Sequence, residues 1–446
     1  MARQKKSDGA AIPAGRLTRF AKFGGLATRV AGDVAASGAR RWAQGDRPEL
    51  RDLVLTPANA ARVTEQLSEL RGAAMKLGQL LSMDAGEMLP PELADILARL
   101  RADAAPMPSK QLRATLDENW GKGWIERFHS FDMRPVAAAS IGQVHRAKQD
   151  DGTDLAIKIQ YPGIARSIDS DVDNVATLIN LSGLVPKGLD LKPFLNEAKK
   201  QLKDEADYVR EGDYVDRFHA LLKDHADYAV PRRIDALTTT TVLAMTYQEG
   251  VSVETMEDAP QAVRNRIIEM LLALLYKELF DFRLMQTDPN FANYRYDPLT
   301  DKLVLLDFGA TREITKDLSE KYRALLRAGR NADREALIAA ALEIGYVDQK
   351  TLDDHGAAIL GLLDMAMEPL QRDAPFDFGN LDLSTRMREA SLSFFQDAVV
   401  AKERRISHVA PTETMFLQRK FAGVFLLASR LKAKVNLRAL IDPYLE

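Results

Sequence analysis

Segments with the period-two pattern of β-strands are confined to one part of this chain, and that grouping constrains its fold most. Residues 143–148 and 155–160 have this period and flank the turn sequence Asp-Asp-Gly-Thr at 150–153, which predicts a β-hairpin. The other candidate strands are residues 229–234, residues 239–246, and a short hairpin formed by 294–296 and 302–306. Strands gathered between helical stretches predict an α+β fold.

Helical spacing of apolar residues covers most of the remaining chain. A hydroxyl cap followed by proline, Thr56-Pro57, begins an amphipathic helix that we expect to continue to about Met83. The other predicted helices cover residues 91–100, 109–119, 165–181, 190–222 and 267–280, the last of them buried. After Gly309 the pattern becomes helical almost at once and no Ala-Pro-Glu follows, which argues against a peptide-docking segment and a broad protein kinase.

Charge is distributed unevenly along the chain. The net charge is −3, yet residues 1–51 carry eleven Lys/Arg against four Asp/Glu, so 11 − 4 = +7 there leaves −10 for the rest. A basic end of this kind suits an anionic lipid surface, nucleic acid or an acidic partner. Residues 16–42 combine basic residues with helical apolar spacing, which is typical of a helix in a membrane interface and equally of one packed on the chain's own body. No run of about eighteen apolar residues occurs, so we expect no transmembrane helix.

Carboxylates and an asparagine form the clearest chemical motif. The chain has no cysteine, which excludes disulfides, cysteine zinc sites and a thiol nucleophile. Asp288-Pro-Asn-Phe-Ala-Asn293 has the spacing of a kinase catalytic loop, and an apolar strand that ends in Asp307-Phe-Gly follows it. Phosphoryl transfer requires a carboxylate that orients the acceptor and oxygen ligands for magnesium. Asp288, Asn293 and Asp307 provide these groups in the right order. The alternative is that Asp288 only starts a turn and Asp307 only caps a strand.

A lysine suited to contact phosphates lies on the second strand of the first hairpin. Alternation places Leu155 and Ile157 on one face of that strand, and Ala156 and Lys158 on the other. Such a lysine can reach the α- and β-phosphates if a carboxylate holds it, although most lysines on half-exposed strands are only solvated.

The loop before this lysine departs from the glycine-rich loop of ordinary kinases. In Ala-Ala-Ala-Ser-Ile-Gly-Gln-Val, residues 137–144, alanines Ala137 and Ala139 replace the first two glycines of the pattern, and only Gly142 remains. We therefore expect a stiffer, bulkier loop that still binds nucleotide with altered geometry or selectivity.

An acidic partner for Lys158 is expected on a later helix. The segment 203–211 provides Glu205, Asp207 and Glu211, and on one helix Glu205 and Glu211 would lie ~120° apart around its axis. One lysine cannot easily satisfy both, so a second lysine is implied. Lys76, which lies beside the apolar stripe of its helix with Gln79, is the candidate, although each of these charges alone could be an ordinary solvated one.

These motifs together resemble the UbiB-type (aarF-domain) atypical kinase-like family, which includes the coenzyme Q biosynthesis kinases. The segments that carry the resemblance are, in chain order, Lys-Leu-Gly-Gln at 76–79, Ala-Ala-Ala-Ser-Ile-Gly-Gln-Val-His-Arg-Ala at 137–147, Ala-Ile-Lys-Ile-Gln-Tyr-Pro-Gly at 156–163, Glu-Ala-Asp-Tyr-x-x-Glu at 205–211, Gln-Thr-Asp-Pro-Asn-Phe-Ala-Asn at 286–293 and Leu-Asp-Phe-Gly at 306–309.

The resemblance implies a bilobal protein-kinase-like fold that binds ATP or ADP with Mg²⁺. The implied catalytic residues are Asp288, Lys158 and Glu211, and the implied metal ligands are Asn293 and Asp307. The implied nucleotide contacts are Ala137, Ala138, Ala139, Ser140, Gly142, Val144, Lys158 and Met245. The implied regulatory residues are Lys76 and Gln79, which would cover the active site, and their partners Glu205 and Asp207.

The resemblance also implies a domain order and a cellular role. It predicts a basic membrane-facing segment at 1–55, a helical extension over the active site at 56–130, a β-rich N-lobe with a helical insertion at 131–247 and a helical C-lobe at 248–446. The expected function is an atypical kinase-like ATPase that supports ubiquinone (coenzyme Q) biosynthesis. A nucleotide-gated scaffold and a small-molecule phosphotransferase are the alternatives.

Partners and location are also expectations from the resemblance. The expected partners are an anionic membrane surface, quinone-biosynthesis enzymes or lipid intermediates, and a second copy of the chain as a homodimer, with no nucleic acid. The expected place is the cytoplasmic side of a bacterial inner membrane as a peripheral protein, with a mitochondrial location as the alternative.

Overall fold

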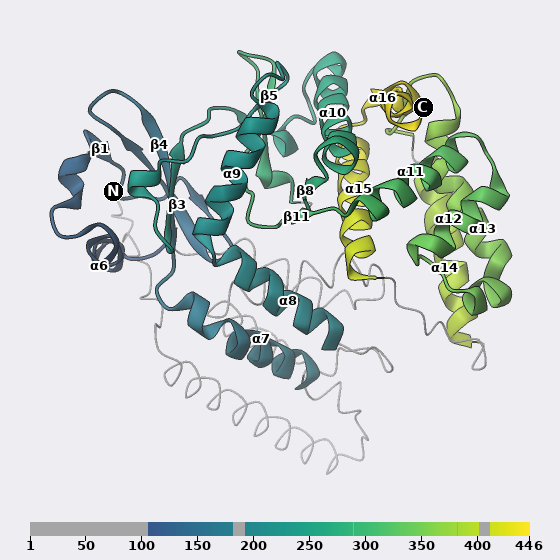
Figure 1. The fold of residues 1–446 in the computed structure, drawn as a ribbon, viewed down its shortest axis with the longest axis horizontal. Coiled ribbons are helices and arrows are strands. Elements are labelled where there is room, and N and C mark those ends of the chain that lie inside the picture. The colour runs from purple at the N-terminus through teal and green to yellow at the C-terminus, as the bar shows by residue number, and fades with distance from the viewer. Residues whose placement is uncertain (1–105, 182–191, 289, 381, 401–410) are drawn as a thin grey trace, which may run out of the picture. The chain divides into compact units, whose positions relative to one another are not determined.

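A computed structural model describes residues 106–181, 192–288, 290–380, 382–400 and 411–446 of this chain (Figure 1). The described residues divide into two compact units: the first comprises those up to Asp216 and Arg232–Tyr247, and the second comprises Arg217–Pro231 and those from Gln248 to Glu446. The predicted helices at 56–83 and 91–100, the basic segment at 1–55, and Lys76 with Gln79 lie outside the described residues.

A five-stranded antiparallel sheet forms the centre of the first unit. Its strands are β1 (Ser130–Phe131), β2 (Ala137–Ala138), β3 (Gly142–Lys148), β4 (Asp154–Gln160) and β6 (Val242–Thr246). The order is β1-β3-β4-β6, and β2 pairs with the part of β3 that β1 leaves free. Strands β3 and β4 are the predicted hairpin, which is therefore confirmed, and Val144 lies opposite Lys158 in its register.

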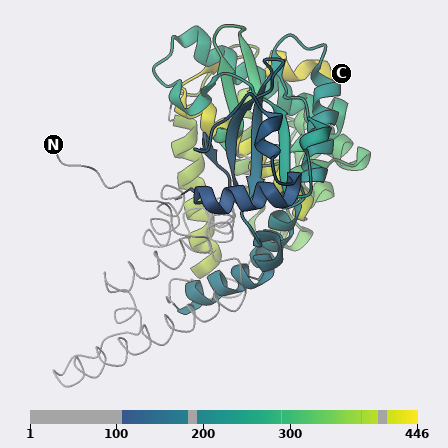
Figure 2. The ribbon, with the colours of Figure 1, turned by 90° about the vertical axis from the view of Figure 1, so that its left-hand side faces the viewer.

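One face of this sheet packs against aromatic side chains. Leu155, Ile157 and Ile159 of β4 belong to a buried cluster that includes Trp120 and Trp124. Trp120 ends helix α6 (Ser109–Trp120), which confirms the helix predicted at 109–119, and Trp124 begins the short helix η2 (Trp124–Arg127). The dark blue helix that crosses the strands in Figure 2 is α6. The intervening residues of β4, Ala156 and Lys158, lie on the opposite face of the sheet, as the alternation along the strand predicted.

Three helices follow the first hairpin, and the last of them continues from the first unit into the second. Helices α7 (Ile164–Leu181) and α8 (Lys192–Glu205) lie side by side, and Lys203 pairs with Asp169 at 2.8 Å between them (Figure 1). Helix α9 (Tyr208–Leu222) follows after a break at 206–207, so the prediction of one helix over 190–222 is wrong. Asp207 causes the break, because its Oδ1 accepts a hydrogen bond from the Arg210 amide at 3.0 Å and caps the new helix.

The second unit is mainly helical. Its α-helices are α10 (Gln261–Tyr276), α11 (Lys316–Arg330), α12 (Arg334–Ile344), α13 (Gln349–Gln371), α14 (Asp382–Val400), α15 (Thr412–Arg430) and α16 (Leu437–Leu445). It also contains the short helices η4 (Val253–Thr255) and η6 (Phe291–Asn293), while the short helix η3 (Asp235–Leu237) belongs to the first unit. Helix α10 confirms the buried helix predicted at 267–280, since Ile267, Leu271 and Leu275 are all buried. Its last predicted residues instead form a π-helical segment, η5 (Lys277–Phe282).

Short strands connect these helices. A four-stranded sheet has the order β5 (Tyr228–Ala229), β10 (Lys302–Leu305), β9 (Tyr294–Asp297) and β7 (Val251–Ser252), and two strand pairs consist of β8 (Leu284–Gln286) with β11 (Thr311–Glu313) and β12 (Phe376–Asp377) with β13 (Lys434–Val435). The β9–β10 pair confirms the predicted second hairpin.

The predictions for short strands need two corrections. The strand predicted at 229–234 is reduced to β5 and a single bridge between Arg233 and Met245, because Pro231 has no amide hydrogen with which to continue a ladder. The chain after Gly309 forms strand β11 before it becomes helical, contrary to the prediction. Strands of two or three residues are too short to show a period of two, so β7, β8, β11, β12 and β13 gave no signal.

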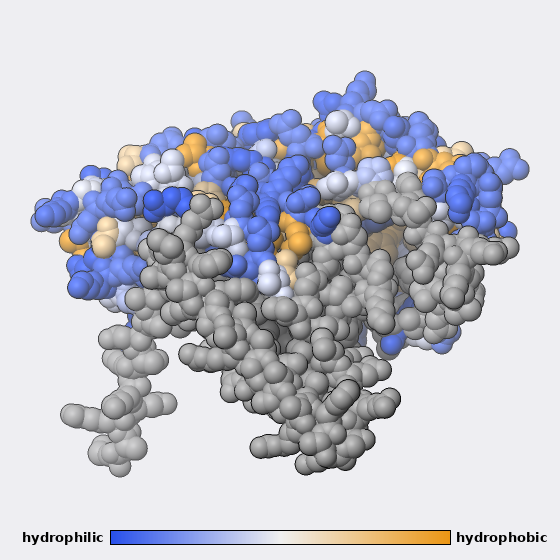
Figure 3. All heavy atoms as spheres, turned by 90° about the horizontal axis from the view of Figure 1, so that it is seen from below, coloured by the Kyte–Doolittle hydropathy of each residue, from blue (hydrophilic) through white to orange (hydrophobic). Residues whose placement is uncertain are grey.

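Within the described part of the chain, no helix is both long and apolar enough to cross a membrane. The described residues visible on the face in Figure 3 are mostly hydrophilic, with apolar residues in separate small groups.

Candidate active site

Lys158 forms a buried ion pair in the first unit. Its Nζ lies 2.8 Å from both Oε1 and Oε2 of Glu211, and the Glu211 side chain is 0% exposed. Strand β4 positions Lys158 in the middle of the sheet, and the first turn of α9 carries Glu211. The Lys158 ammonium also lies over the Tyr208 ring, 5.2 Å from its centroid. The pairing that the resemblance implied for Lys158 is therefore present, while the catalytic role of the pair stays a prediction.

The alanine-rich loop is a tight hairpin. Ala137 and Ala138 pair with Val144 and Gln143, and the Ala139 amide donates to the Gly142 carbonyl at 2.9 Å. A Cβ on Gly142 would lie 2.3 Å from the Ile159 carbonyl oxygen, so the backbone of β3 approaches that of β4 too closely for any side chain. The glycine that remains in the loop is thus required by packing between strands, without any unusual φ angle.

Ser140 and Glu205 are joined although they were predicted for different roles. The Ser140 hydroxyl donates to Glu205 Oε2 at 2.5 Å, which fastens the turn of the hairpin to the last residue of α8. The predicted angle of ~120° between Glu205 and Glu211 is wrong, because the break at Asp207 places them on two helices. The inference that one lysine does not serve both holds for Lys158, which pairs with Glu211.

Met245 lies on β6 opposite Ala156 of β4 and is buried. Its predicted contact with the nucleotide, like those of the 137–144 loop, stays a prediction.

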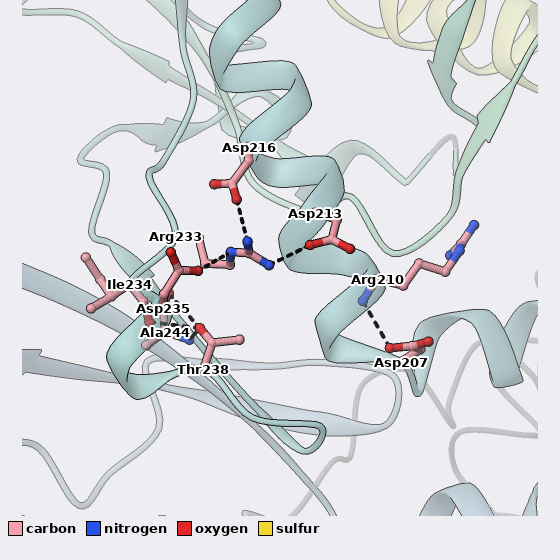
Figure 4. Close-up of polar contacts among 9 residues, drawn as sticks. All are labelled: Asp207, Arg210, Asp213, Asp216, Arg233, Ile234, Asp235, Thr238 and Ala244. Atoms are coloured by element: carbon pink, nitrogen blue, oxygen red, sulfur yellow. Dashed lines mark hydrogen bonds and ion pairs between the residues drawn. The ribbon is translucent and has the colours of Figure 1, made fainter.

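An arginine that the sequence reasoning missed fastens α9 to the chain before β6. Arg233 pairs with Asp213 at 2.7 Å, with Asp216 at 2.8 Å and with Asp235 at 2.7 Å (Figure 4). Gly212 leaves room for it, since a Cβ there would lie 2.6 Å from the Arg233 Cδ. Two aspartates three residues apart on one helix face, next to a glycine, were the available signal for this contact. The ion pairs of Arg233 with Asp213 and Asp216 hold α9, the helix that carries Glu211, against the chain before β6.

In the second unit, the three residues predicted to bind magnesium and the acceptor lie in the two loops that flank the β9–β10 hairpin. Asn293 ends η6 and is buried, and its carbonyl accepts a hydrogen bond from the Leu306 amide at 3.0 Å, next to Asp307. Asp288 is half-buried and its Oδ1 accepts from the Asn290 amide at 3.2 Å. Asp307 follows β10, and its Oδ1 accepts from the Gly309 amide at 3.0 Å.

Hydrogen bonds tie the two loops of this site together. The Gln286 side chain donates to the Asp307 carbonyl, and the Thr287 hydroxyl donates to the Ala310 carbonyl at 2.7 Å. Phe308 is fully buried, with its ring 5.0 Å from that of Phe218. The structure thus brings Asn293 and Asp307 together within the second unit.

The donor atoms suit magnesium that arrives with a nucleotide. Mg²⁺ prefers oxygen ligands and is usually held by one or two carboxylates together with substrate phosphates and water. Asp307 supplies a carboxylate and Asn293 an amide oxygen, which fits that arrangement. Among the described residues, no group of three or more His, Cys, Asp and Glu side chains could hold a metal by itself. In the usual arrangement for Mg²⁺, phosphate oxygens and water complete the coordination.

Comparison with known proteins gives concordant matches. The model of the ABC1 atypical kinase-like domain matches residues 99–341. The yeast protein called "Atypical kinase COQ8, mitochondrial" (Saccharomyces cerevisiae) is 38% identical over 431 residues, which cover 95% of this chain and 84% of that protein. The rat protein called "Atypical kinase COQ8B, mitochondrial" (Rattus norvegicus) is 36% identical over 437 residues, which cover 97% of this chain and 80% of that protein.

A solved structure, described as the complex of Rv3197 with erythromycin from Mycobacterium tuberculosis, has the same fold. The TM-score is 0.58 at 25% sequence identity, and the match covers 86% of this chain and 94% of the other.

Proposed function

This chain belongs to the ABC1 atypical kinase-like family, and from that premise we propose that it cleaves the γ-phosphoryl group of Mg-ATP in support of coenzyme Q biosynthesis. The family and the kinase-like α+β fold inferred from the motifs are confirmed. The role in coenzyme Q biosynthesis is suggested by the names of the COQ8 relatives, which match along nearly the whole chain.

The observation that carries the enzymatic proposal is the buried pair of Lys158 and Glu211. An ammonium and a carboxylate taken out of water add little stability by themselves, and well-packed apolar residues of the same volume often serve as well or better. A fixed lysine head group can instead bind the α- and β-phosphates, and Glu211 orients it for that contact.

The second unit would supply the remaining groups. Asn293 and Asp307 would hold Mg²⁺, which when bound neutralises charge on the phosphates. Asp288 would orient the attacking hydroxyl or water, with its carboxylate as the acceptor of the proton. The short chain between Gly309 and α11 offers no long segment for docking a peptide, which favours water or a small molecule as the acceptor.

The test is Mg²⁺-dependent release of ADP by the full-length protein and by Asp307→Asn. We expect the variant to lose at least ~100-fold in rate, because one of the two protein ligands of Mg²⁺ loses its charge. Asp258→Asn is the control, since Asp258 is an exposed carboxylate of the same unit outside the proposed site, and it should leave the rate unchanged. Equal rates for the unaltered protein and Asp307→Asn would disprove the mechanism.

A nucleotide-gated scaffold is the second candidate function. The alanine-rich loop is a hairpin whose turn is bonded to α8 through Ser140 and Glu205, and this favours the scaffold. A loop held in this way can bind nucleotide without changing conformation during phosphoryl transfer. Tight ATP binding with no turnover, even with anionic vesicles and quinone-precursor mimics present, would support the scaffold over the enzyme.

We also propose peripheral attachment to a membrane through residues 1–51. Both relatives described above are mitochondrial by name, which favours a mitochondrial membrane, and the cytoplasmic face of a bacterial inner membrane is the alternative. The excess of basic residues predicts retention on vesicles that contain anionic lipid, weakened by salt. If deletion of residues 1–51 leaves retention unchanged, this part of the proposal is wrong.

A further inference from the structure

A second buried ion pair, absent from the sequence motifs, lies inside the second unit. Lys420 of α15 is 2% exposed and Glu278 of the π-helical segment is 0% exposed, and Lys420 Nζ lies 3.2 Å from Glu278 Oε2. Burial raises the pKa of Glu278, and Lys420 partly offsets that rise. Desolvation lowers the pKa of Lys420, but Glu278 and Tyr294 outweigh it and leave this pKa raised.

Each end of this pair reaches a neighbour of a proposed magnesium ligand. Lys420 Nζ donates to the Tyr294 hydroxyl at 2.5 Å, and Tyr294 directly follows Asn293. Glu278 Oε1 accepts from the Gln286 amide at 3.2 Å. The Gln286 side chain in turn donates to the carbonyl of Asp307. The pair therefore connects the two loops that carry Asn293 and Asp307.

Stability alone does not account for such an arrangement. Replacing a buried ion pair with apolar residues of similar volume is often neutral or stabilising, so its presence needs another reason. Residues behind metal ligands fix the orientation of those ligands, and their loss typically costs 10–100-fold in metal affinity. π-Helical turns such as the one that carries Glu278 also occur frequently at functional sites.

We propose that Lys420 is a positioning residue, which acts through Tyr294 and through Glu278 with Gln286 to hold Asn293 and Asp307 at the spacing that Mg²⁺ requires. This inference rests on the proposed function, because it assumes that Asn293 and Asp307 bind Mg²⁺ with a nucleotide. It assigns to α15 a role in the metal site that the motifs alone did not indicate.

The experiment uses the full-length protein and two alterations of the connection. Tyr294→Phe removes only the hydroxyl that Lys420 contacts. The double variant Lys420→Met with Glu278→Gln removes both charges together and leaves no lone buried charge. The matched control is Tyr322→Phe, because Tyr322 is also a buried tyrosine of the second unit whose hydroxyl lies 2.6 Å from another group, the Tyr346 hydroxyl.

The measurement is binding of a fluorescent ADP analogue as Mg²⁺ is titrated, followed by its affinity at saturating Mg²⁺. We expect Tyr294→Phe and the double variant to require ~10-fold more Mg²⁺ for half-maximal binding. At saturating Mg²⁺ their affinity for the analogue should return to that of the unaltered protein. Tyr322→Phe should require no additional Mg²⁺.

The outcomes separate this inference from the proposed function. If the unaltered protein binds the analogue with Mg²⁺ and the Tyr294→Phe and double variants show the same Mg²⁺ dependence, the positioning role is refuted while the function stands. An equal shift in Tyr322→Phe would show that the effect is a general loss of packing, which also refutes the role. If the unaltered protein shows no Mg²⁺-dependent binding, both the function and this inference are wrong.

Discussion

Removal of either partner of the Lys158–Glu211 pair should destabilise the first unit far more than removal of both. At 2.8 Å and an effective dielectric constant of ~20, the attraction between the two charges is about 6 kcal/mol before desolvation is subtracted. A single substitution, Lys158→Met or Glu211→Gln, leaves the other charge buried. We therefore expect a loss of about 3–5 kcal/mol in the free energy of unfolding for each single variant.

The double variant Lys158→Met with Glu211→Gln should recover most of this loss, because no isolated charge remains. The assay is denaturant unfolding followed by tryptophan fluorescence, since Trp120 and Trp124 report on the first unit. As a control, Lys203→Met removes the exposed pair with Asp169 and should cost less than ~1 kcal/mol. Additive losses in the double variant, with a coupling energy near zero, would refute the reasoning.

Two further predictions concern the same unit. Gly142→Ala should lower the free energy of unfolding by about 1–3 kcal/mol, because its Cβ would lie 2.3 Å from the Ile159 carbonyl oxygen. Gly361→Ala is the control, since the space around Gly361 is open, and it should be neutral or stabilising. Denaturant unfolding again provides the measurement. Burial lowers the pKa of His145 below its ordinary 6.5, so the unfolded chain binds this proton more readily than the folded one. The contribution of neutral His145 to the free energy of unfolding should therefore be fully present above about pH 6.5. As the pH is lowered from there, the free energy of unfolding should fall by up to ~1.4 kcal/mol per pH unit. The slope should be smaller in His145→Gln, and an unchanged slope would refute this account.

The neutral state of His145 follows from its contacts. Its Nδ1 lies 2.8 Å from the Asp132 carbonyl, which can only accept, so Nδ1 carries the hydrogen. Its Nε2, 2.7 Å from Gln143 Nε2, must then accept from that amide. A proton added to Nε2 would face a donor, which is the physical reason for the expected acid sensitivity.

Long elements and chemically marked motifs could be predicted from the sequence. The seven-residue strands β3 and β4 show their period clearly, and the lysine of β4 has the predicted carboxylate partner. The end of α8 could not be placed, because one capping side chain, Asp207, outweighs a helical pattern that continues on both sides of it. A capping aspartate looks the same in the sequence as a solvated one.

Contacts between distant segments that no motif marks could not be predicted, for a different reason. Lys420 and Glu278 sit within apolar helical sequence, where each resembles an ordinary surface charge until the packing of α15 against α10 is known. Asp213 and Asp216 marked one helix face, but the sequence could not assign Arg233 to them, since a charged residue in a connecting segment has many possible partners. Only the folded chain reveals which one is chosen.

The junction of α8 and α9 links the capping of a helix to the position of Glu211. Asp207 ends one helix and starts the next, and the following turn carries Glu211, the residue that grips Lys158. Loss of the Asp207 cap would therefore loosen the turn of α9 that orients Glu211, so a change at the end of α8 would reach the buried pair without contacting it.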